Sequence, residues 1–192
     1  MQNTFRPVKD AVTVLTELMI PSYANFGGKV HGGLILSLLD KVAYTCASKH
    51  CSGYCVTVSV DGVDFHSPVE VGDLVSMYAS VNYVGKSSMV VGVKVVSENF
   101  KKGTTTHTNT SFFTMVAMDE ETKKPIPVPG LILESADDIR RFIEASKRKE
   151  LKTQYKAALK KHNEEARNQA YFKLLEGQNC IVPDSTSLFP KS

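Results

Sequence analysis

The chain carries between Gly33 and Ser48 the segment GLILSLLDKVAYTCAS. A helix drawn from this segment has apolar side chains on nearly every side, where a surface helix would have them along one stripe. A helix of this kind is buried over most of its surface, so other parts of the chain must enclose it. The sequence therefore predicts a long central helix with the rest of the fold wrapped around it.

Segments rich in Val, Thr, Tyr, Phe and Ser flank this helix, one before it and four after it. They cover residues 12–20, 54–63, 72–84, 88–98 and 104–118. Short turn sequences such as Val84-Gly85-Lys86 separate the later segments, so most neighbouring strands should be antiparallel and the sheet should curl. These features predict an α+β fold with a curled antiparallel sheet of about five to six strands around the helix.

A proline-rich stretch with the sequence PIPVPG, Pro125 to Gly130, ends the strand pattern. Alternating prolines stop both helices and central strands. The following Ser135-Ala136-Asp137-Asp138 offers a helix cap with acidic residues in the first turn. We expect a core domain over residues 8–130, a C-terminal helical extension over residues 131–178 and a flexible tail over residues 179–192.

The composition of the chain limits the cellular location and the partners that we expect for it. No apolar run approaches the roughly 20 residues that span a bilayer, and Arg6, Lys9 and Asp10 interrupt any export signal. We therefore expect a cytoplasmic protein without membrane contact. Residues 1–130 carry 11 Lys and Arg and 11 Asp and Glu. A nucleic acid is not an expected partner, because binding to a phosphate backbone needs a concentrated basic face.

The chain has four cysteines, Cys46, Cys51, Cys55 and Cys180. Without an export signal they are expected to be reduced thiols, and their spacing lacks the paired C-x2-C form of a zinc site. We interpret them as small buried side chains. His66 and His107 share no metal-like spacing with each other or with other histidines, so no metal site is predicted.

Two glycines, Gly32 and Gly33, come directly before the central helix. Glycines in this position let a ligand approach the chain closely and leave the first backbone N–H groups unpaired, directed at negative charge. A developing oxyanion would suit this place. The same glycines could serve only the close packing of the helix against the sheet, and by themselves they would favour that interpretation.

Asp40 is a carboxylate within an almost wholly apolar helix. Such a group costs free energy unless it is paired, hydrogen-bonded or used in chemistry. It could form a salt bridge with Lys41 or Lys49, or it could face solvent on a polar strip of the helix. It could equally be the general base for a water molecule. The residues alone leave the structural and the catalytic interpretations evenly balanced.

The spacing between Gly33 and Asp40 adds a constraint. The two residues lie about two turns apart on one helix face, or about 10 Å along the axis. One carbonyl and its attacking water occupy only ~3 Å. These two residues of a single chain could hardly serve one reacting carbon, so a catalytic role for both requires a site shared between two chains.

The segment from Pro21 to Asp40 reads PSYANFGGKVHGGLILSLLD. It resembles the Asn-x-x-Gly-x-x-(Phe/His)-Gly-Gly-x6-Asp signature of the hotdog acyl-CoA hydrolases, which include a bacterial YciA type and a mammalian brain type. Further similar segments are residues 56–61, 65–69, 72–73 and 82–88. The resemblance covers residues from about 10 to 130 in the family's order and implies the hotdog fold.

This resemblance implies hydrolysis of acyl-CoA to free fatty acid and CoA. No cofactor would be needed, because CoA is part of the substrate. Asn25 and Asp40 would form the catalytic pair, contributed by opposite subunits, and backbone N–H groups at Gly32 and Gly33 would polarise the thioester carbonyl. Asp40 would activate water or attack directly. Members of this family often form trimers of dimers, so at least a dimer and, further, a homohexamer is expected.

The turn Gly85-Lys86-Ser87-Ser88 lies where the family places its contacts to CoA. Lys86 suits a phosphate group as a mobile point charge, although many relatives have Arg at this position. His31 stands where relatives often have Phe, and it is expected to shape the pocket without acting as a base.

Two alternatives come from other functional classes. A hotdog hydratase would carry a His a few residues after the catalytic Asp, where this chain has Thr45 five residues after Asp40. A non-catalytic regulatory protein that binds acyl-CoA would keep the pocket but lose Asn25 or Asp40. It would usually add a DNA-binding segment, and the tail shows no clear recognition helix.

Overall fold

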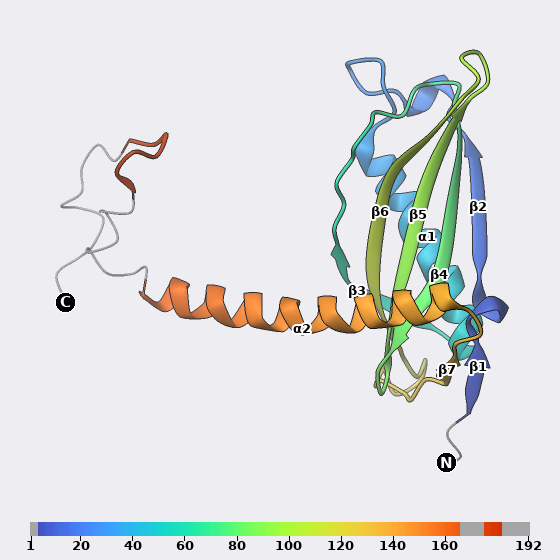
Figure 1. Cartoon of the computed structure of the whole chain (residues 1–192), viewed down its shortest axis with the longest axis vertical. Coiled ribbons are helices and arrows are strands. Elements are labelled where there is room, and N and C mark those ends of the chain that lie inside the picture. The colour runs from blue at the N-terminus through green and yellow to red at the C-terminus, as the bar shows by residue number, and fades with distance from the viewer. Residues whose placement is uncertain (1–3, 166–174, 182–192) are drawn as a thin grey trace. The chain divides into compact units, whose positions relative to one another are not determined.

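The computed structural model describes residues 4–165 and 175–181 (Figure 1). Its elements are β1 (Phe5–Pro7), η1 (Val8–Ala11), β2 (Thr13–Leu18), η2 (Pro21–Tyr23), α1 (Gly32–Cys51), β3 (Cys55–Asp61), β4 (Leu74–Val84), β5 (Ser88–Asn99), β6 (Thr104–Ala117), β7 (Gly130–Ile132) and α2 (Ala136–Glu165). Residues 1–145 and 146–192 form two units, divided within α2. The domain boundary expected at residue 130 stays a prediction. The predicted helix over residues 166–174 and the tail from residue 182 onward lie outside the described residues.

The central helix α1 extends beyond the predicted segment at both ends. His31 is its N-cap, and the ring Nδ1 of His31 accepts a hydrogen bond from the Gly33 N–H at 2.9 Å. The helix ends at Ser52, which has a left-handed conformation with φ of 53°, and its N–H donates to the Ser48 carbonyl. A residue with positive φ turns the chain out of the helix direction, so α1 stops and the chain enters β3.

Five strands form one antiparallel sheet in the order β2-β4-β5-β6-β3. The sheet packs against α1, as Figure 1 shows, and confirms the predicted hotdog arrangement. A second, two-stranded sheet was not predicted. It pairs β1 with β7 in parallel and holds the amino-terminal segment against the segment that follows the proline-rich stretch.

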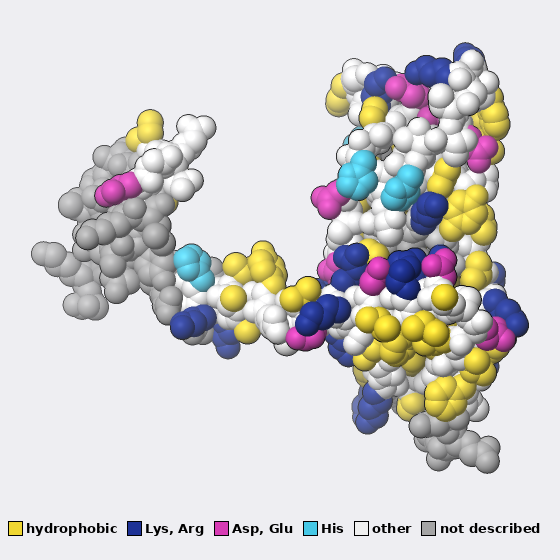
Figure 2. Space-filling model, in the orientation of Figure 1, with side chains coloured by type: hydrophobic (Ala, Val, Ile, Leu, Met, Phe, Trp, Pro, Cys, Tyr) yellow, Lys and Arg dark blue, Asp and Glu magenta, His cyan; other side chains and the backbone are white. Residues whose placement is uncertain are grey.

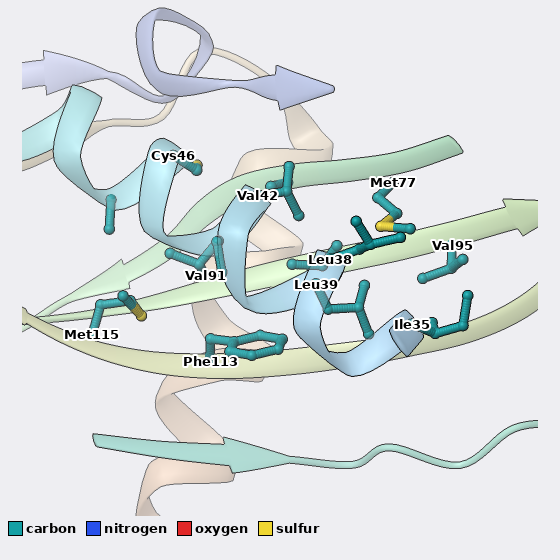
Figure 3. Packing of buried hydrophobic residues seen from close by; sticks show 14 of the residues in the cluster. Ile35, Leu38, Leu39, Val42, Cys46, Met77, Val91, Val95, Phe113 and Met115 are labelled. Atoms are coloured by element: carbon teal, nitrogen blue, oxygen red, sulfur yellow. The ribbon is translucent and has the colours of Figure 1, made fainter. Parts of the chain in front are cut away.

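The hydrophobic core lies between α1 and the sheet. Figure 3 shows Ile35, Leu38, Leu39, Val42 and Cys46 of α1 packed against Met77, Val91, Val95, Phe113 and Met115 of the strands. Leu39 is fully buried, as are alternate residues along β5. Because side chains alternate between the two faces of a strand, this pattern buries one face of the sheet under the helix. The expected burial over most of the helix surface is wrong for the single chain, because the face of α1 that carries Leu36, Asp40 and Tyr44 is exposed.

The turn before β4 is fastened by the buried carboxylate of Asp73. Its Oδ2 accepts hydrogen bonds from the Ser97 hydroxyl at 2.6 Å and from the Glu70 N–H at 3.2 Å, and its Oδ1 accepts one from Asn99 Nδ2 at 2.6 Å. A buried carboxylate with several donors is satisfied without a cation. Asp73 therefore fixes the loop that follows β3 to the far end of β5.

The first turns of α2, up to Ala145, belong to the same unit as the sheet. Ser135 and Asp138 form a capping box: the Asp138 N–H donates to Ser135 Oγ, and Asp138 Oδ2 accepts from the Ser135 N–H. Arg140 pairs with Asp137 and Glu144. Figure 2 shows Lys or Arg and Asp or Glu side chains next to one another along the start of α2. The ring of Phe142 lies against Tyr83 of β4, with ring centroids 5.1 Å apart.

The part of α2 from Ser146 onward belongs to the second unit. Its described side chains are mostly polar and are linked along the helix, as in the ion pair between Lys147 and Glu150 at 2.8 Å. Polar side chains linked in this way are typical of a helix surface exposed to solvent. Neither helix of the described residues combines the length and the apolar character needed to cross a membrane.

Candidate active site

Asp40 lies on the exposed side of α1 that faces strand β3. Its Oδ1 accepts a hydrogen bond of 2.6 Å from the hydroxyl of Thr57, a residue of β3. None of the ion pairs among the described residues involves Asp40, so the salt bridge considered with Lys41 or Lys49 does not form. The carboxylate is oriented by one neutral donor on an exposed residue, so a water molecule can reach it as a general base requires.

Asn25 lies in the loop between η2 and α1, where its side chain closes a turn. Its Oδ1 accepts hydrogen bonds from the Gly27 N–H at 2.9 Å and from the Lys29 N–H at 3.1 Å. Two backbone donors can only face the carbonyl oxygen of the amide, which fixes the orientation of the group. The amide NH2 makes no hydrogen bond to the residues that the structure describes, so Asn25 can donate to an external oxygen.

The two glycines at the start of α1 have different surroundings. The Gly33 N–H is occupied by His31, and a Cβ at Gly33 would lie 3.0 Å from the His31 ring. The Gly32 N–H makes no hydrogen bond within residues 4–165. Of the two expected oxyanion donors, Gly32 is therefore the one whose N–H is open, while Gly33 allows His31 to cap the helix. His31 accepts through Nδ1, so a neutral ring carries its proton on Nε2.

The fold does not bring Asn25 and Asp40 together within one chain. No hydrogen bond joins them, and Asp40 lies about 12 Å along the helix axis from Gly32. Asp40 contacts Thr57 of β3, a strand that pairs only with β6 among the described strands. Val58 and Val60 of β3 are 61% and 42% exposed. Asp40 and Thr57 thus lie near an open sheet edge with exposed apolar residues.

Two of the four residues expected to contact CoA line a cavity of about 630 Å³. Gly85 and Lys86 are among its lining residues, whereas Ser87 and Ser88 are not. The Gly85 N–H donates to the Ser88 carbonyl at 2.7 Å, which closes the turn between β4 and β5. The backbone of Ser88 therefore closes the turn, and Lys86 is the charged residue of the turn among those that line the cavity.

Arg6 also lines this cavity and was not identified from the sequence. The pairing of β1 with β7 places it there, and its Nη1 donates to the His50 carbonyl at 2.8 Å and to Ser52 Oγ at 2.6 Å. Arg6 and Lys86 are the charged residues among those that line the cavity. The cavity is suited to an anionic group such as a phosphate.

The histidines away from the motif form no metal site. The rings of His66 and His107 lie 6.4 Å apart, and His107 Nε2 is hydrogen-bonded to Thr110 Oγ1 at 2.9 Å. Among the described residues, no group of three or more His, Cys, Asp or Glu side chains is placed to hold a metal ion.

Thr57 is the polar neighbour of Asp40 that the sequence interpretation missed, because a Thr within a strand pattern carries no signal of its own.

A long helix packed on a curled five-stranded antiparallel sheet is the arrangement of the hotdog fold. Residues 27–104 match the family described as the thioesterase superfamily. The protein VdlD of Helicobacter pylori is 48% identical over 140 residues, which are 73% of this chain and 79% of VdlD. YkhA of Bacillus subtilis, named an uncharacterized acyl-CoA thioester hydrolase, is 37% identical over 131 residues, 68% of this chain and 76% of YkhA. The chain belongs to the thioesterase superfamily, among its acyl-CoA thioester hydrolases.

Solved structures agree with this assignment. A hexameric acyl-CoA thioesterase superposes with a TM-score of 0.77 at 38% identity, covering 80% of this chain and 98% of that chain. The acyl-CoA hydrolase of Staphylococcus aureus, solved with butyryl-CoA and CoA, gives 0.75 at 27% identity, covering 85% and 99%. Variants of that enzyme replace one Asn, one Asp and one Thr by Ala. The spacing between the replaced Asn and Asp equals that between Asn25 and Asp40. The spacing between the replaced Asp and Thr equals that between Asp40 and Thr57.

Proposed function

We propose that this protein hydrolyses acyl-CoA thioesters to a free fatty acid and CoA. The observation that carries the proposal is the exposed carboxylate of Asp40, held by Thr57 at 2.6 Å and free of any cation among the described residues, on the central helix of a thioesterase fold. Such a group can take a proton from water while the water attacks a carbonyl carbon. The carbon–sulfur bond then breaks, and the CoA thiolate leaves and takes up a proton.

Asn25 and Gly32 would stabilise the negative charge that develops on the thioester oxygen. Both present a donor without a partner among the described residues, the amide NH2 of Asn25 and the N–H of Gly32. A donor aimed at a developing oxyanion typically contributes about 3 kcal/mol to transition-state stabilisation. Because the side-chain oxygen of Asn25 is committed to its own loop, we assign Asn25 to the carbonyl oxygen of the substrate. We assign Asp40 to the activation of the attacking water.

We infer that the site is completed by a second copy of the chain across the open edge of β3. Antiparallel pairing of two β3 strands about a two-fold axis would cover Val58 and Val60 and would set the two α1 helices in opposite directions. The Asn25 end of one helix would then face the middle of the other, where Asp40 lies. A trimer of such dimers is the proposed assembly, as the hexameric thioesterase suggests, and a cytoplasmic location stays part of this proposal.

We assign the CoA phosphates to the cavity with Arg6 and Lys86. Asp40 and Cys51, at the cavity wall, are about 16 Å apart along the axis of α1, comparable with the length of an extended pantetheine arm. A phosphate held at the cavity and a thioester held at the level of Asp40 are thus compatible with one substrate molecule. No cofactor is needed for this reaction, since water is the second reactant.

The direct test is release of free thiol from acyl-CoA by the purified protein, followed with a thiol reagent. A series of substrates from acetyl-CoA to palmitoyl-CoA should show turnover that varies with the acyl chain, because the pocket binds that chain. Absence of turnover across the whole series, with a folded oligomer, would contradict the proposal.

Replacing Thr57 by Val should lower kcat about tenfold or more and leave KM close to its original value. The change keeps the shape of the side chain and removes the hydroxyl that orients Asp40, and hydrogen bonds to charged groups contribute about 1.5–3 kcal/mol. Thr57→Ser, which keeps the hydroxyl, is the matched control and should retain most of the activity. Equal kcat values for the two variants would show that Thr57 does not position Asp40.

Replacing Lys86 by Ala should raise KM for acyl-CoA about fivefold, equivalent to about 1 kcal/mol for an exposed charge, and change kcat little. Added salt should reduce the difference between the two proteins, since it screens exposed charges. Lys101→Ala, at an exposed lysine in the turn between β5 and β6, is the control and should leave KM unchanged. An unchanged KM in the Lys86 variant would remove this residue from the CoA site.

A further inference from the structure

Two cysteines meet where α1 ends and β3 begins. Cys51 is the last residue of α1 and Cys55 the first of β3, and their sulfur atoms lie 3.3 Å apart. A disulfide bond is about 2.05 Å long, so a shift of little more than about 1 Å would join them. The connecting residues Ser52, in a left-handed conformation, and Gly53 bring the two thiols side by side. Such contact between thiols distinguishes this pair from Cys46 and Cys180.

The two thiols differ in accessibility. Cys51 is half-buried and lines the cavity that contains Arg6 and Lys86, whereas Cys55 is only 2% exposed. The interpretation of all four cysteines as small buried side chains therefore holds for Cys46 and Cys55, but is wrong for Cys51 and Cys180. A reagent in the cavity can reach Cys51 but not Cys55. Cys51 is therefore suited to attack a reagent, and Cys55 is suited to displace the reagent from Cys51 afterwards.

Electrostatics support the same division of roles. The hydrogen bond with the Cys55 thiol lowers the pKa of Cys51 to about 7, with smaller contributions from backbone groups of the turn and from Arg6, against the effect of partial burial. The same hydrogen bond and burial raise the pKa of Cys55. The negative end of α1 would oppose a thiolate at Cys51, but Arg6 donates to the carbonyls of Lys49 and His50 and offsets it.

The charged residues that line the cavity are all positive. Its charged lining residues are Arg6 and Lys86, and no Asp or Glu is among the residues that line it. Cationic walls raise the local concentration of anions, by a factor of about 10 or more in a focusing cleft. A negatively charged disulfide would therefore reach Cys51 more often than a positively charged one.

We propose that Cys51 and Cys55 form a redox-active dithiol that is oxidised by anionic small-molecule disulfides entering the cavity with Arg6 and Lys86. The Cys51 thiolate attacks one sulfur of the disulfide, forms a mixed disulfide and releases one thiolate. Cys55 loses its proton to water and attacks the Cys51 sulfur. The Cys51–Cys55 bond forms and the second thiolate leaves, so that two electrons pass from the dithiol to the small disulfide.

The test uses oxidised glutathione as the anionic probe and cystamine as the cationic one, with the reduced full-length protein and peptide mapping by mass spectrometry. The exposed Cys180 serves as an internal reference for intrinsic reactivity. Relative to Cys180, Cys51 should react about tenfold faster with oxidised glutathione than with cystamine. Lys86→Ala should reduce this ratio. A ratio near one in the wild-type protein would overturn the selection of anionic disulfides.

Two variants test the division of roles. The wild-type protein should end with a Cys51–Cys55 disulfide, whereas Cys55→Ser should stop at the mixed disulfide on Cys51. Cys51→Ser should leave Cys55 unmodified, because Cys55 is buried. A mixed disulfide that persists in the wild-type protein, or rapid modification of Cys55 in a Cys51→Ser protein with an unchanged melting temperature, would overturn the proposal. Thioesterase activity is not needed for any of these measurements.

Discussion

Asp40→Asn is expected to lower kcat for acyl-CoA hydrolysis by about 10²- to 10⁴-fold, the range typical of a lost general base. The amide keeps the shape of the side chain and can still accept the Thr57 hydroxyl bond, but it cannot take a proton from water. Because Asp40 is exposed and forms no ion pair among the described residues, the melting temperature should change little.

Asp64→Asn is the matched control for this variant, since Asp64 is an exposed carboxylate in the loop after β3. It should retain full activity. Wild-type kcat in the Asp40 variant, measured by thiol release with saturating substrate, would contradict the assignment of Asp40 as the base.

A mixture of variants tests whether the site is shared. Asn25→Ala and Asp40→Ala proteins should each be inactive, and equal amounts should recover about one quarter of wild-type activity after subunit exchange. Half of the dimers would be hybrids, and each hybrid would contain one site with both residues intact, as two-fold symmetry requires. No recovery after exchange verified by mass spectrometry would mean that both residues act within one chain.

Leu39→Ala is expected to lower the free energy of unfolding by about 3 kcal/mol, within the range of about 2–5 kcal/mol for buried leucines. Leu39 has no exposed surface and lies in the middle of the core between α1 and the sheet (Figure 3). Its truncation removes apolar contacts and leaves a cavity that the surrounding strands cannot close.

Leu36→Ala is the matched control, the same change one turn earlier on α1 at a residue that is 37% exposed. It should cost less than about 1 kcal/mol in the monomeric fold. Urea unfolding at equal protomer concentration measures both, because the stability of an oligomer depends on concentration. Equal shifts of the midpoint for the two variants would contradict the packing described here.

The sequence predicted the central helix and all five strands of the main sheet to within a few residues. Apolar periodicity and turn residues act over short distances along the chain, and these local signals agree with the final fold. The two-stranded sheet of β1 and β7 was missed because each strand is only three residues long and its partner lies more than a hundred residues away.

The sequence by itself determined the fold class and the family. It also identified Asn25 and Asp40 as candidate catalytic residues, because both lie in one contiguous motif. It left open what Asp40 contacts. Only the tertiary structure decided that Thr57 orients it, that His31 occupies the Gly33 N–H, and that Arg6 and Cys51 share a cavity with Lys86. The reason is physical: hydrogen bonds and cavities depend on which strands and helix ends are adjacent in space, and adjacency between distant segments has no periodic signal along the chain.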